Sequence, residues 1–499
     1  MSSSAPPVDR LAAKPSRAPR RVDATPALSP AERWGLALLL LAAAGLRTWG
    51  IARFPLEQDE LYTVMEGREL FDVPLAPGIH ARPLYFLLQH LLLHALGDGP
   101  VALRVVPFLF GVAGVWAVWA LARRVFGTPA AFAAGALLAM APWHLHASGF
   151  ARYWSLLFLL GALWQRGLWE AYERGRPRDF ALALAALALG TATHPSFLFP
   201  AAGAALGVTL VRADGRFGWR WPSRAAWARL WLPYAALLLA AYAALRLTGH
   251  AGAVRNWGGR GWAASLRILP AIVEWLSPAV AVAALLGAAS ALASRDAGRR
   301  RWGAMAACGA TTTLVALMAA SLRTDIYADY ATAMLPLAFV SAGGLIAMGV
   351  EKMASARGLA VATATAVICA AVLPATASHL AGGTRFDYRP AFEWLRRNAA
   401  PGAAVLTWPG IVGTHYAPDL RTRGLLMDTA ALDSTLAALR EVWIVASVQR
   451  FGIAGDDGAV AAWLARHCSL EARFERPRWD YRVYRVEVHR CRAALVSGA

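Results

Sequence analysis

The stretch FPLEQDELYTVMEGRELFDVPLAPGIHARPLY, from Phe54 to Tyr85, follows the first long apolar segment of the chain. Acidic residues are scarce near the other apolar segments, but this stretch carries six carboxylates: Glu57, Asp59, Glu60, Glu66, Glu69 and Asp72. A charge run of this kind is often a solvated loop. However, the Asp59-Glu60 pair lies within a few residues of the end of the apolar segment, and this position favours a chemical role.

The composition indicates a polytopic membrane protein. Of the 499 residues, 58% are hydrophobic, and the mean hydropathy is +0.42. About eleven segments approach or exceed the roughly 20 apolar residues that cross a bilayer. They are Trp34–Arg53, Val101–Arg123, Ala130–Pro142, Arg152–Trp169, Asp179–Thr193, Ser196–Val211, Ala228–Leu247, Leu269–Ala293, Trp302–Leu322, Tyr330–Val350 and Gly358–Ser378. We therefore predict a helical membrane domain over residues 34–380, after a disordered cytoplasmic tail at residues 1–33.

The charge pattern predicts the topology. The net charge of +19 comes mainly from arginines in short loops between apolar segments, which is typical of cytoplasmic loops and indicates no nucleic-acid partner. Leu84–Leu96 has about 13 residues and is too short to span a bilayer easily. The basic loops all lie in the cytoplasm only if this segment is an interfacial or re-entrant helix. Basic flanks likewise make Asp179–Val211 a hairpin that turns at Thr193-His194-Pro195.

This topology gathers the unusual polar residues outside the cytoplasm, together with a first outer loop at residues 54–100. These residues are Asp59, Glu60, His80, Arg82, His144, His146, Arg152, Tyr153, His194, His250, Arg255, Arg260, Asp325, Asp329 and Tyr330. Such an asymmetry predicts an active site at the outer face of the cytoplasmic (inner) membrane.

After Ser378 the composition becomes polar, and we predict a small extracytoplasmic α/β domain over residues 385–492. Helices are expected at Pro390–Ala399 and Gly458–His467, and strands at Val405–Trp408, Glu441–Ser447, Leu470–Phe474 and Tyr481–Val488. No GxGxxG, Walker A or HExxH motif is present. Cys468 and Cys491 flank the last expected hairpin in a compartment where disulfides persist, so we expect a bridge between them.

The Asp-Glu pair shortly after a first span resembles the GT-C-fold glycosyltransferases that use polyprenyl-phosphate sugars. This group includes protein O-mannosyltransferases, lipid A aminoarabinose transferases and rhizobial lipopolysaccharide-core transferases. Further similar motifs follow in the family's order: Arg82-Pro83-Leu84-Tyr85, Leu103-Arg104 with Pro107 and Phe110-Gly111, Arg123-Arg124-Val125-Phe126-Gly127, Pro142-Trp143-His144, Ala151-Arg152-Tyr153, Thr193-His194, and Tyr330 with Leu335-Pro336. The likeness covers roughly residues 34–350 and the plan of an outer C-terminal domain.

The resemblance implies a GT-C-like fold and an inverting transfer of a sugar from a polyprenyl-phosphate carrier to an acceptor hydroxyl of an envelope glycan, lipid or protein. An acceptor hydroxyl needs a base, and a carboxylate fills this role. The leaving phosphate is already a stable anion and needs cations more than an acid. We assign Asp59 as the base and Glu60 as a second catalytic residue that helps to hold the acceptor or a metal. The alternative is that both are ordinary helix-start carboxylates.

The residues expected to bind the donor phosphate are Arg152, Arg82, His194, Tyr330 and Arg323. Arg152 is the first choice because a guanidinium offers a two-pronged donor, although it could instead be an interfacial anchor, and His194 could make a structural hydrogen bond. The chain departs from the family pattern at two positions. His80 is offset by one residue, and Asp329 stands where the family has an arginine. Arg323 could take the place of that missing arginine. No cofactor is certain, and a divalent metal stays open because no diagnostic spacing occurs.

Two other classes of function compete with a transferase. A transporter or flippase of envelope precursors would use intramembrane charges as a path and would be expected to show inverted repeats. A non-catalytic scaffold for envelope assembly is the second alternative. The sequence shows no inverted repeat, and its polar residues lie at one membrane face instead of the midplane, so transfer is favoured.

Overall fold

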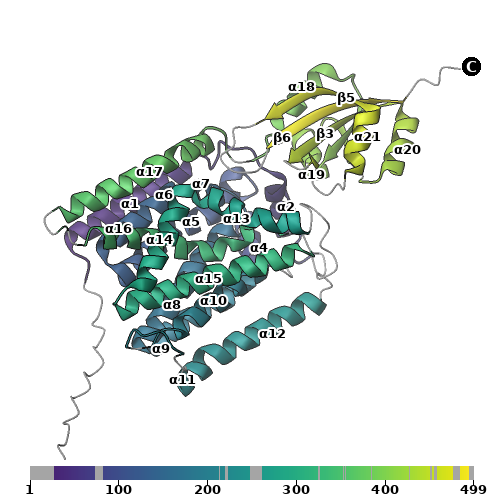
Figure 1. Ribbon diagram of the computed structural model, residues 1–499. Coiled ribbons are helices and arrows are strands. Elements are labelled where there is room, and N and C mark those ends of the chain that lie inside the picture. Colours follow the sequence, from purple (N-terminus) through teal and green to yellow (C-terminus); the bar gives the residue numbers. More distant parts are fainter. Residues whose placement is uncertain are drawn as a thin grey trace, which may run out of the picture.

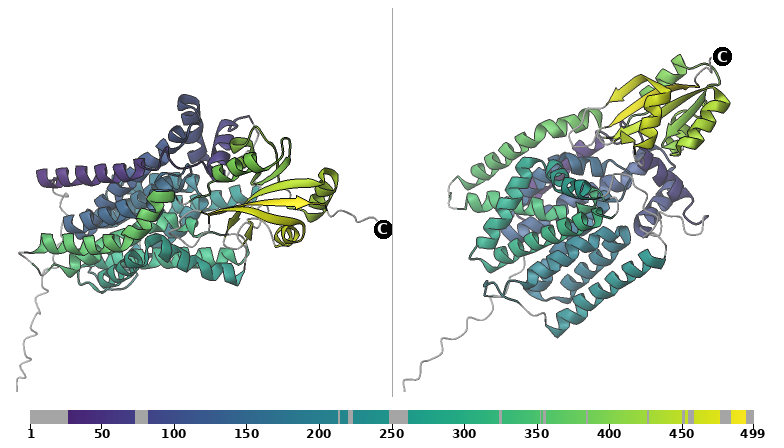
Figure 2. Two further views of the ribbon diagram at one scale, coloured as in Figure 1. Left: turned by 90° about the horizontal axis from the view of Figure 1, so that it is seen from above. Right: turned by 45° about the vertical axis from the view of Figure 1, so that its right-hand side comes forward.

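The computed structural model describes residues 27–72, 82–212, 214–219, 223–247, 261–323, 326–351, 353, 356–383, 385–425, 427–449, 452–453, 458–475 and 484–493. Within these residues the chain forms a large helical bundle, and a small α/β domain lies at one end of the bundle in every view (Figure 1 and Figure 2). The predicted plan of a helical part followed by a small C-terminal sheet is therefore present.

In the helical part, local residues such as proline and glycine mark where helices begin and end. Its elements are α1 (Pro30–Thr48), α2 (Gln58–Arg68), α4 (Pro83–Leu96), α5 (Pro100–Phe126), α6 (Thr128–Met140), α7 (Pro142–Ser148), α8 (Trp154–Arg174), α9 (Pro177–Thr193), η1 (Pro195–Phe197), α10 (Leu198–Thr209), α11 (Arg224–Ala226), η2 (Trp227–Trp231), α12 (Leu232–Leu247), α13 (Trp262–Leu276), α14 (Pro278–Ala293), α15 (Ala297–Ser321), η3 (Ala328–Met334), α16 (Leu335–Gly349) and α17 (Arg357–Gly382). Prolines such as Pro83 and Pro100 stand in the first turn, where the missing N–H would have no helical partner anyway. α8 ends at Arg174 and is capped by Gly175, whose φ of 64° is left-handed and suits a residue without Cβ.

The number of membrane spans differs from the prediction. Four described helical segments are long and apolar enough to cross a membrane, namely α5, α15, Ala328–Gly349 and α17, and the bent pair α13–α14 makes a fifth if it counts as one span. Other helices are shorter, such as α6 with 13 residues, or carry charges near their ends, such as Glu170 and Arg174 in α8. A multi-pass membrane protein is present, but the count of about eleven spans is not confirmed by the described residues.

The predicted segment Leu269–Ala293 is not one helix. α13 ends at Leu276, and α14 begins at Pro278 with a bend of 99° between the two. Proline disfavours a helical conformation in the residue before it, and Ser277 has a φ of 66° and a ψ of 143°. Hydropathy alone merges two helices that Pro278 separates.

Two other predicted short segments have the expected secondary structure. Leu84–Leu96 lies in α4, a helix of 14 residues. The turn expected at Thr193-His194-Pro195 is present, because α9 ends at Thr193 and η1 begins at Pro195.

The α/β domain is built around one mixed sheet. Its elements are α18 (Arg389–Asn398), β1 (Ala404–Trp408), α19 (Gly410–Tyr416), β2 (Arg421–Gly424), α20 (Thr429–Leu439), β3 (Glu441–Gln449), β4 (Gly452–Ile453), α21 (Ala459–His467), β5 (Cys468–Glu475) and β6 (Arg485–Arg492). The strand order is β2-β1-β3-β6-β5, with β1 parallel to β2 and β3, and β6 antiparallel to β3 and β5. The elements predicted from the sequence are present at different bounds, and residues 481–483 of the strand predicted at Tyr481–Val488 lie outside the described residues. No sequence pattern predicts α19, β2, α20 or β4.

The two faces of the sheet pack against different partners. Side chains alternate between the faces along a strand. Ile444 of β3 packs into a core with α20 and α21. Its neighbour Val445 packs on the opposite face with α18, in a core that also contains Leu56 and Leu61 of the helical part. The sheet therefore shares a hydrophobic core with the helix that carries Asp59.

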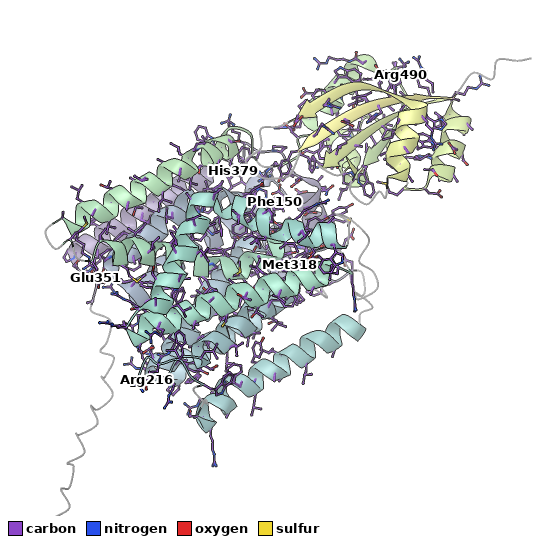
Figure 3. All side chains as sticks on the ribbon, in the orientation of Figure 1. Phe150, Arg216, Met318, Glu351, His379 and Arg490 are labelled. Carbon is purple, nitrogen blue, oxygen red and sulfur yellow. A yellow bond between two sulfur atoms is a disulfide. The ribbon has the colours of Figure 1, made fainter. Side chains whose placement is uncertain are left out.

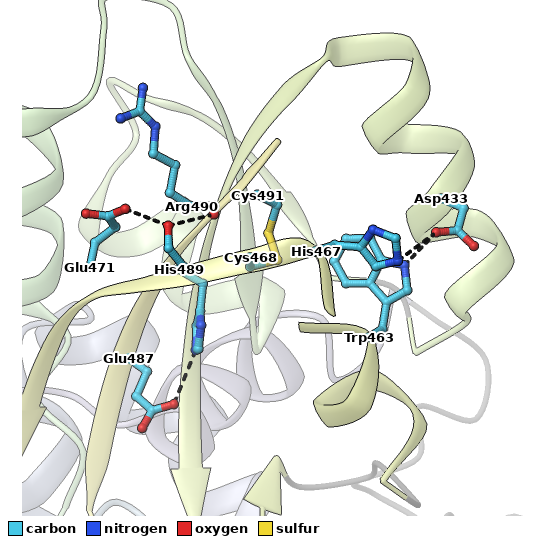
Figure 4. The surroundings of a disulfide bond; sticks show 10 residues. Asp433, Trp463, His467, Cys468, Glu471, Glu487, His489, Arg490 and Cys491 are labelled. Atoms are coloured by element: carbon cyan, nitrogen blue, oxygen red, sulfur yellow. Dashed lines mark hydrogen bonds and ion pairs between the residues drawn. A yellow bond between two sulfur atoms is a disulfide. The ribbon is translucent and has the colours of Figure 1, made fainter. Parts of the chain in front are cut away.

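A disulfide joins Cys468 and Cys491, as the sequence predicts (Figure 4). The two residues are direct neighbours in the antiparallel pair of β5 and β6, with Cα atoms 4.0 Å apart. The other two cysteines, Cys308 and Cys369, are free. The bridge ties the last strand of the domain to the strand beside it.

Removing this bridge by the double change Cys468→Ser and Cys491→Ser should destabilise the α/β domain by about 3 kcal/mol, because a cross-link restricts the unfolded chain. The bridge itself is checked by counting thiols in unfolded protein. Two reactive thiols are expected before reduction, from Cys308 and Cys369, and four afterwards. Four thiols without reduction would show that the bridge does not form.

Candidate active site

Glu60 lies in the first turn of α2 and is completely buried. Its carboxylate accepts hydrogen bonds from Arg104 at 2.7 Å from both Nε and Nη2, and from Nη1 of Arg385 at 2.9 Å. The backbone N–H groups of Ala151 and Glu57 donate to it at 2.9 and 3.2 Å. Burial acts to raise the pKa of Glu60, but the charges of Arg104 and Arg385 outweigh this effect and lower the pKa. The predicted contact of Glu60 with acceptor or metal does not fit these surroundings, because the protein already uses its oxygens.

Arg104 fixes the loop that leads into α2. From α5 it donates to the carbonyl oxygens of Ile51, Phe54 and Pro55, at 2.8 to 2.9 Å, in addition to its two bonds to Glu60. All five N–H groups of the guanidinium are therefore used. The start of α2 is held in one position relative to α5.

Asp59 precedes Glu60 in the chain but has different surroundings. Its side chain is 41% exposed, and its Oδ1 lies 3.3 Å from Nη2 of Arg152. Arg152, whose side chain is 12% exposed, also donates from Nη1 to Thr63 Oγ1 at 3.3 Å. Phe150, two residues before Arg152, lies at the end of the bundle nearest the α/β domain (Figure 3). Asp59 is thus an accessible carboxylate beside an arginine at the junction of the two domains.

Several residues predicted to bind phosphate come together near Asp59. The Cζ atom of Arg82 lies 5.1 Å from the centroid of the Tyr153 ring. The Tyr153 ring stacks on His194, with 5.1 Å between centroids and 12° between planes. His194 in turn lies 4.9 Å from the ring of Tyr330. We define the cationic–aromatic cluster as Arg82, Arg152, Tyr153, His194 and Tyr330; its members come from the segments before α4 and α8, the end of α9, and η3.

The orientation of His194 follows from its place between α9 and η1. Its Nδ1 accepts a hydrogen bond from the backbone N–H of Ser196 at 3.1 Å, and the Oγ of Ser196 is 2.8 Å from the same atom. In a neutral imidazole an accepting Nδ1 leaves the proton on Nε2. His194 therefore has one hydrogen-bond donor, Nε2–H, that these contacts do not use.

Other predicted residues do not join the cluster. Arg323 is exposed after α15, and within the described ranges it makes no hydrogen bond or ion pair with the cluster. His144 and His146 are buried in α7, and Nδ1 of His144 lies 2.6 Å from Nη2 of Arg47. Asp329 is buried in η3. The predicted residues His80, His250, Arg255, Arg260 and Asp325 lie outside the described residues.

The part of the chain that the structure describes holds no group of three or more His, Cys, Asp or Glu side chains suited to a metal ion. Glu60 is occupied by Arg104 and Arg385, and His194 is packed between two aromatic rings. The described site therefore places the accessible carboxylate of Asp59 beside a set of cations and aromatic rings.

The sequence does not assign a role to two residues of the site, Arg104 and Arg385. Arg104 belongs to the Leu103-Arg104 motif of the family resemblance, and this is the signal that could have identified it. Arg385 stands at the border between the apolar and polar parts of the chain, where no local pattern marks it. Its partner Glu60 lies 325 residues earlier.

Comparison with known families and structures gives a consistent result for the fold. Residues 77–244 match the family model of dolichyl-phosphate-mannose-protein mannosyltransferases. No match was found among curated protein sequences. The chain is similar to the crystal structure of ArnT from Cupriavidus metallidurans in the apo state, with 14% identity, 94% of this chain and 100% of that chain covered, and a TM-score of 0.54.

Two further structures are similar over most of the chain. ArnT from Cupriavidus metallidurans bound to undecaprenyl phosphate has 14% identity, covers 95% of this chain and 100% of that chain, and has a TM-score of 0.51. The oligosaccharyltransferase of Archaeoglobus fulgidus tethered with an acceptor peptide has 14% identity, covers 83% of this chain and 69% of that chain, and has a TM-score of 0.53. The chain therefore has the fold of these structures, which is the GT-C fold that the sequence resemblance implies.

Proposed function

We propose that the protein is a membrane glycosyltransferase that moves a sugar from a polyprenyl-phosphate carrier to a hydroxyl group of an envelope glycan, lipid or protein. The observation that carries this proposal is the accessible carboxylate of Asp59, 3.3 Å from Arg152 at the edge of the cationic–aromatic cluster. The family match over residues 77–244 and the similarity to ArnT bound to undecaprenyl phosphate support it.

Asp59 supplies the base of this reaction. As the acceptor oxygen bonds to the anomeric carbon of the sugar, its proton passes to the Asp59 carboxylate. The bond from that carbon to the phosphate oxygen breaks, and the electron pair stays on the phosphate. A single displacement of this kind inverts the configuration at the anomeric carbon. No second carboxylate has to protonate the leaving group, which agrees with the burial of Glu60.

The cationic–aromatic cluster supplies positive charge and hydrogen-bond donors for the leaving phosphate. Arg152 and Arg82 provide the charge, and Nε2–H of His194 and the hydroxyl of Tyr330 are further donors. Hydrogen bonds from a guanidinium to phosphate are about twice as strong as neutral ones. A phosphate would also compete with Asp59 for Arg152 and so leave the Asp59 carboxylate available to the acceptor. If a divalent ion takes part, Asp59 would be one of its carboxylate ligands, whereas the oxygens of Glu60 are occupied by Arg104 and Arg385.

The function is tested with purified, lipid-reconstituted protein and a panel of labelled polyprenyl-phosphate sugars. We expect one donor class to bind and to lose its sugar to an acceptor from the cell envelope. The same assay with and without a metal chelator measures whether transfer needs a metal ion. Movement of the intact donor across the vesicle membrane without transfer would favour the transporter. Failure to bind any donor would overturn the proposal.

Replacing Arg152 with methionine should weaken donor binding roughly 10- to 100-fold, because hydrogen bonds to charged groups contribute about 1.5–3 kcal/mol. The matched control is Arg323→Met. Arg323 is exposed and makes no contact with the cluster within the described ranges, so its loss should change donor binding by less than about 3-fold. Equal losses in the two variants would mean that the phosphate does not lie at Arg152.

The proposed orientation has a cytoplasmic N-terminus and an α/β domain outside the cytoplasm. It requires an odd number of crossings, as about eleven spans would provide. A periplasm-dependent reporter fused after Ala499 should be active, and the same reporter fused before Met1 should be inactive. The reverse pattern would contradict the proposed orientation.

A further inference from the structure

The connection between α17 and α18 is packed into the helical part of the protein. α17 ends at Gly382, and Gly383 follows with a φ of 68°. A Cβ at position 383 would lie 3.0 Å from ring atoms of Phe54, so this backbone approaches the loop before α2 very closely. Glycine is suited to this position both by its φ and by its size.

Arg385, two residues later, is completely buried. Its Nη1 donates to Glu60 Oε2 at 2.9 Å and to the carbonyl of Pro55 at 3.3 Å, and its Nη2 donates to the carbonyl of Gly149 at 3.0 Å. Its Cζ lies 5.3 Å from the centroid of the Phe54 ring and 5.5 Å from that of Phe150. Arg385 therefore joins the loop before α2 to the segment after α7.

These two segments carry the reacting groups of the proposed function. Glu60 is the immediate neighbour of Asp59, and the segment from Gly149 leads to Arg152. The same Glu60 carboxylate also accepts the N–H of Ala151 at 2.9 Å, so it binds the second segment directly. Glu60 and Arg385 together set the distance between the two chain segments that present Asp59 and Arg152.

The residues after Arg385 belong to the α/β domain. Phe386 and Tyr388 are buried in the core that the sheet shares with Leu56 and Leu61. Tyr416 of α19 donates its hydroxyl to the carbonyl of Leu56 at 2.6 Å. A shift of the α/β domain would therefore act on Arg385 and on the start of α2 together.

We propose that Arg385 is a positioning residue, which holds Asp59 and Arg152 in register only while the α/β domain is docked on the helical part. The α/β domain thus takes part in forming the site. This inference rests on the proposed function for the identity of the reacting groups. The contacts of Arg385 with the loop before α2 and with the segment after α7 do not depend on that function.

The first measurement uses no substrate and compares Arg385→Met and Arg385→Lys with the wild type in lipid nanodiscs. Amide hydrogen exchange reports local opening. The amide of Ala151 and the amides at the start of α2 should exchange at least about 10-fold faster in Arg385→Met, with a smaller change in Arg385→Lys, which keeps the charge. Arg389→Met is the matched control, because Arg389 is 45% exposed and pairs locally with Asp387. It should leave these amides unchanged.

The second measurement is kinetic. Because a misplacement near 1 Å can reduce a rate about 10²-fold, Arg385→Met should lower kcat roughly 10- to 100-fold with a donor KM within about 3-fold of wild type. Arg385→Lys, which retains the charge, supplies the same comparison if the methionine variant does not fold. Unchanged exchange at Ala151 in a folded variant, or a rise in KM with unchanged kcat, would overturn the positioning role. Absence of sugar transfer by the wild type would instead overturn the proposed function, and the exchange result would still stand.

Discussion

Replacing Asp59 with asparagine is expected to lower the rate of sugar transfer roughly 10²- to 10⁴-fold, because the amide cannot accept the proton of the acceptor hydroxyl. The substitution keeps the size of the side chain. It should also leave donor binding nearly intact, because Asp59 provides no donor to phosphate. Single-turnover rates and donor affinity, measured separately, distinguish a loss of chemistry from a loss of binding.

Two control variants make the Asp59 result specific. Asp98→Asn removes a carboxylate from the same outer region, where Asp98 is 52% exposed and pairs with Arg68, and it should transfer sugar at the wild-type rate. Glu60→Gln removes charge from a buried residue, and it should be less impaired in transfer than Asp59→Asn. Wild-type turnover by Asp59→Asn, with the true donor and acceptor, would remove Asp59 from the mechanism.

Replacing Arg104 with methionine should destabilise the protein by about 3–5 kcal/mol, the usual effect of breaking a buried ion pair from one side. The Glu60 carboxylate would lose its two 2.7 Å bonds, and Arg385 alone would remain to balance its charge. The carbonyls of Ile51 and Phe54 would lose the bonds that Arg104 donates to them. Thermal or denaturant unfolding in detergent measures this effect.

The matched control for Arg104 is Arg68→Met. Arg68 also pairs with a carboxylate, at 2.8 Å to Asp98, but its side chain is 56% exposed. Exposed ion pairs contribute less than about 1 kcal/mol, so this variant should unfold almost like the wild type. Similar unfolding of the two variants would show that the buried network around Glu60 does not hold the start of α2.

Much of the local structure could be predicted from the sequence because it depends on neighbouring residues. Prolines in first turns predict where helices such as α4 begin. A short continuous apolar run predicts β3 as a buried strand, and its two faces pack into two different cores. The bend between α13 and α14 follows from Pro278, a local signal that a hydropathy average does not register. The Cys468–Cys491 pair could be expected because both residues flank one hairpin.

The roles of Asp59 and Glu60 show where such reasoning ends. They are adjacent carboxylates in the same helical turn, and by sequence either could be the accessible one. The structure leaves Asp59 41% exposed and buries Glu60 completely. The sequence favours Arg152 over Arg323 as a phosphate ligand but does not place either beside a carboxylate; in the structure Arg152 lies against Asp59.

The sequence by itself determined the membrane class, the order of the helices, the plan of the C-terminal domain and the importance of the segment around Asp59, because these depend on local composition and spacing. Tertiary structure alone decided which carboxylate is accessible and which arginines surround the other. Arg104 and Arg385 reach Glu60 across 44 and 325 residues of chain. Burial of a charge depends on the packing of elements that are distant in sequence, and a local pattern does not record which distant side chains will meet.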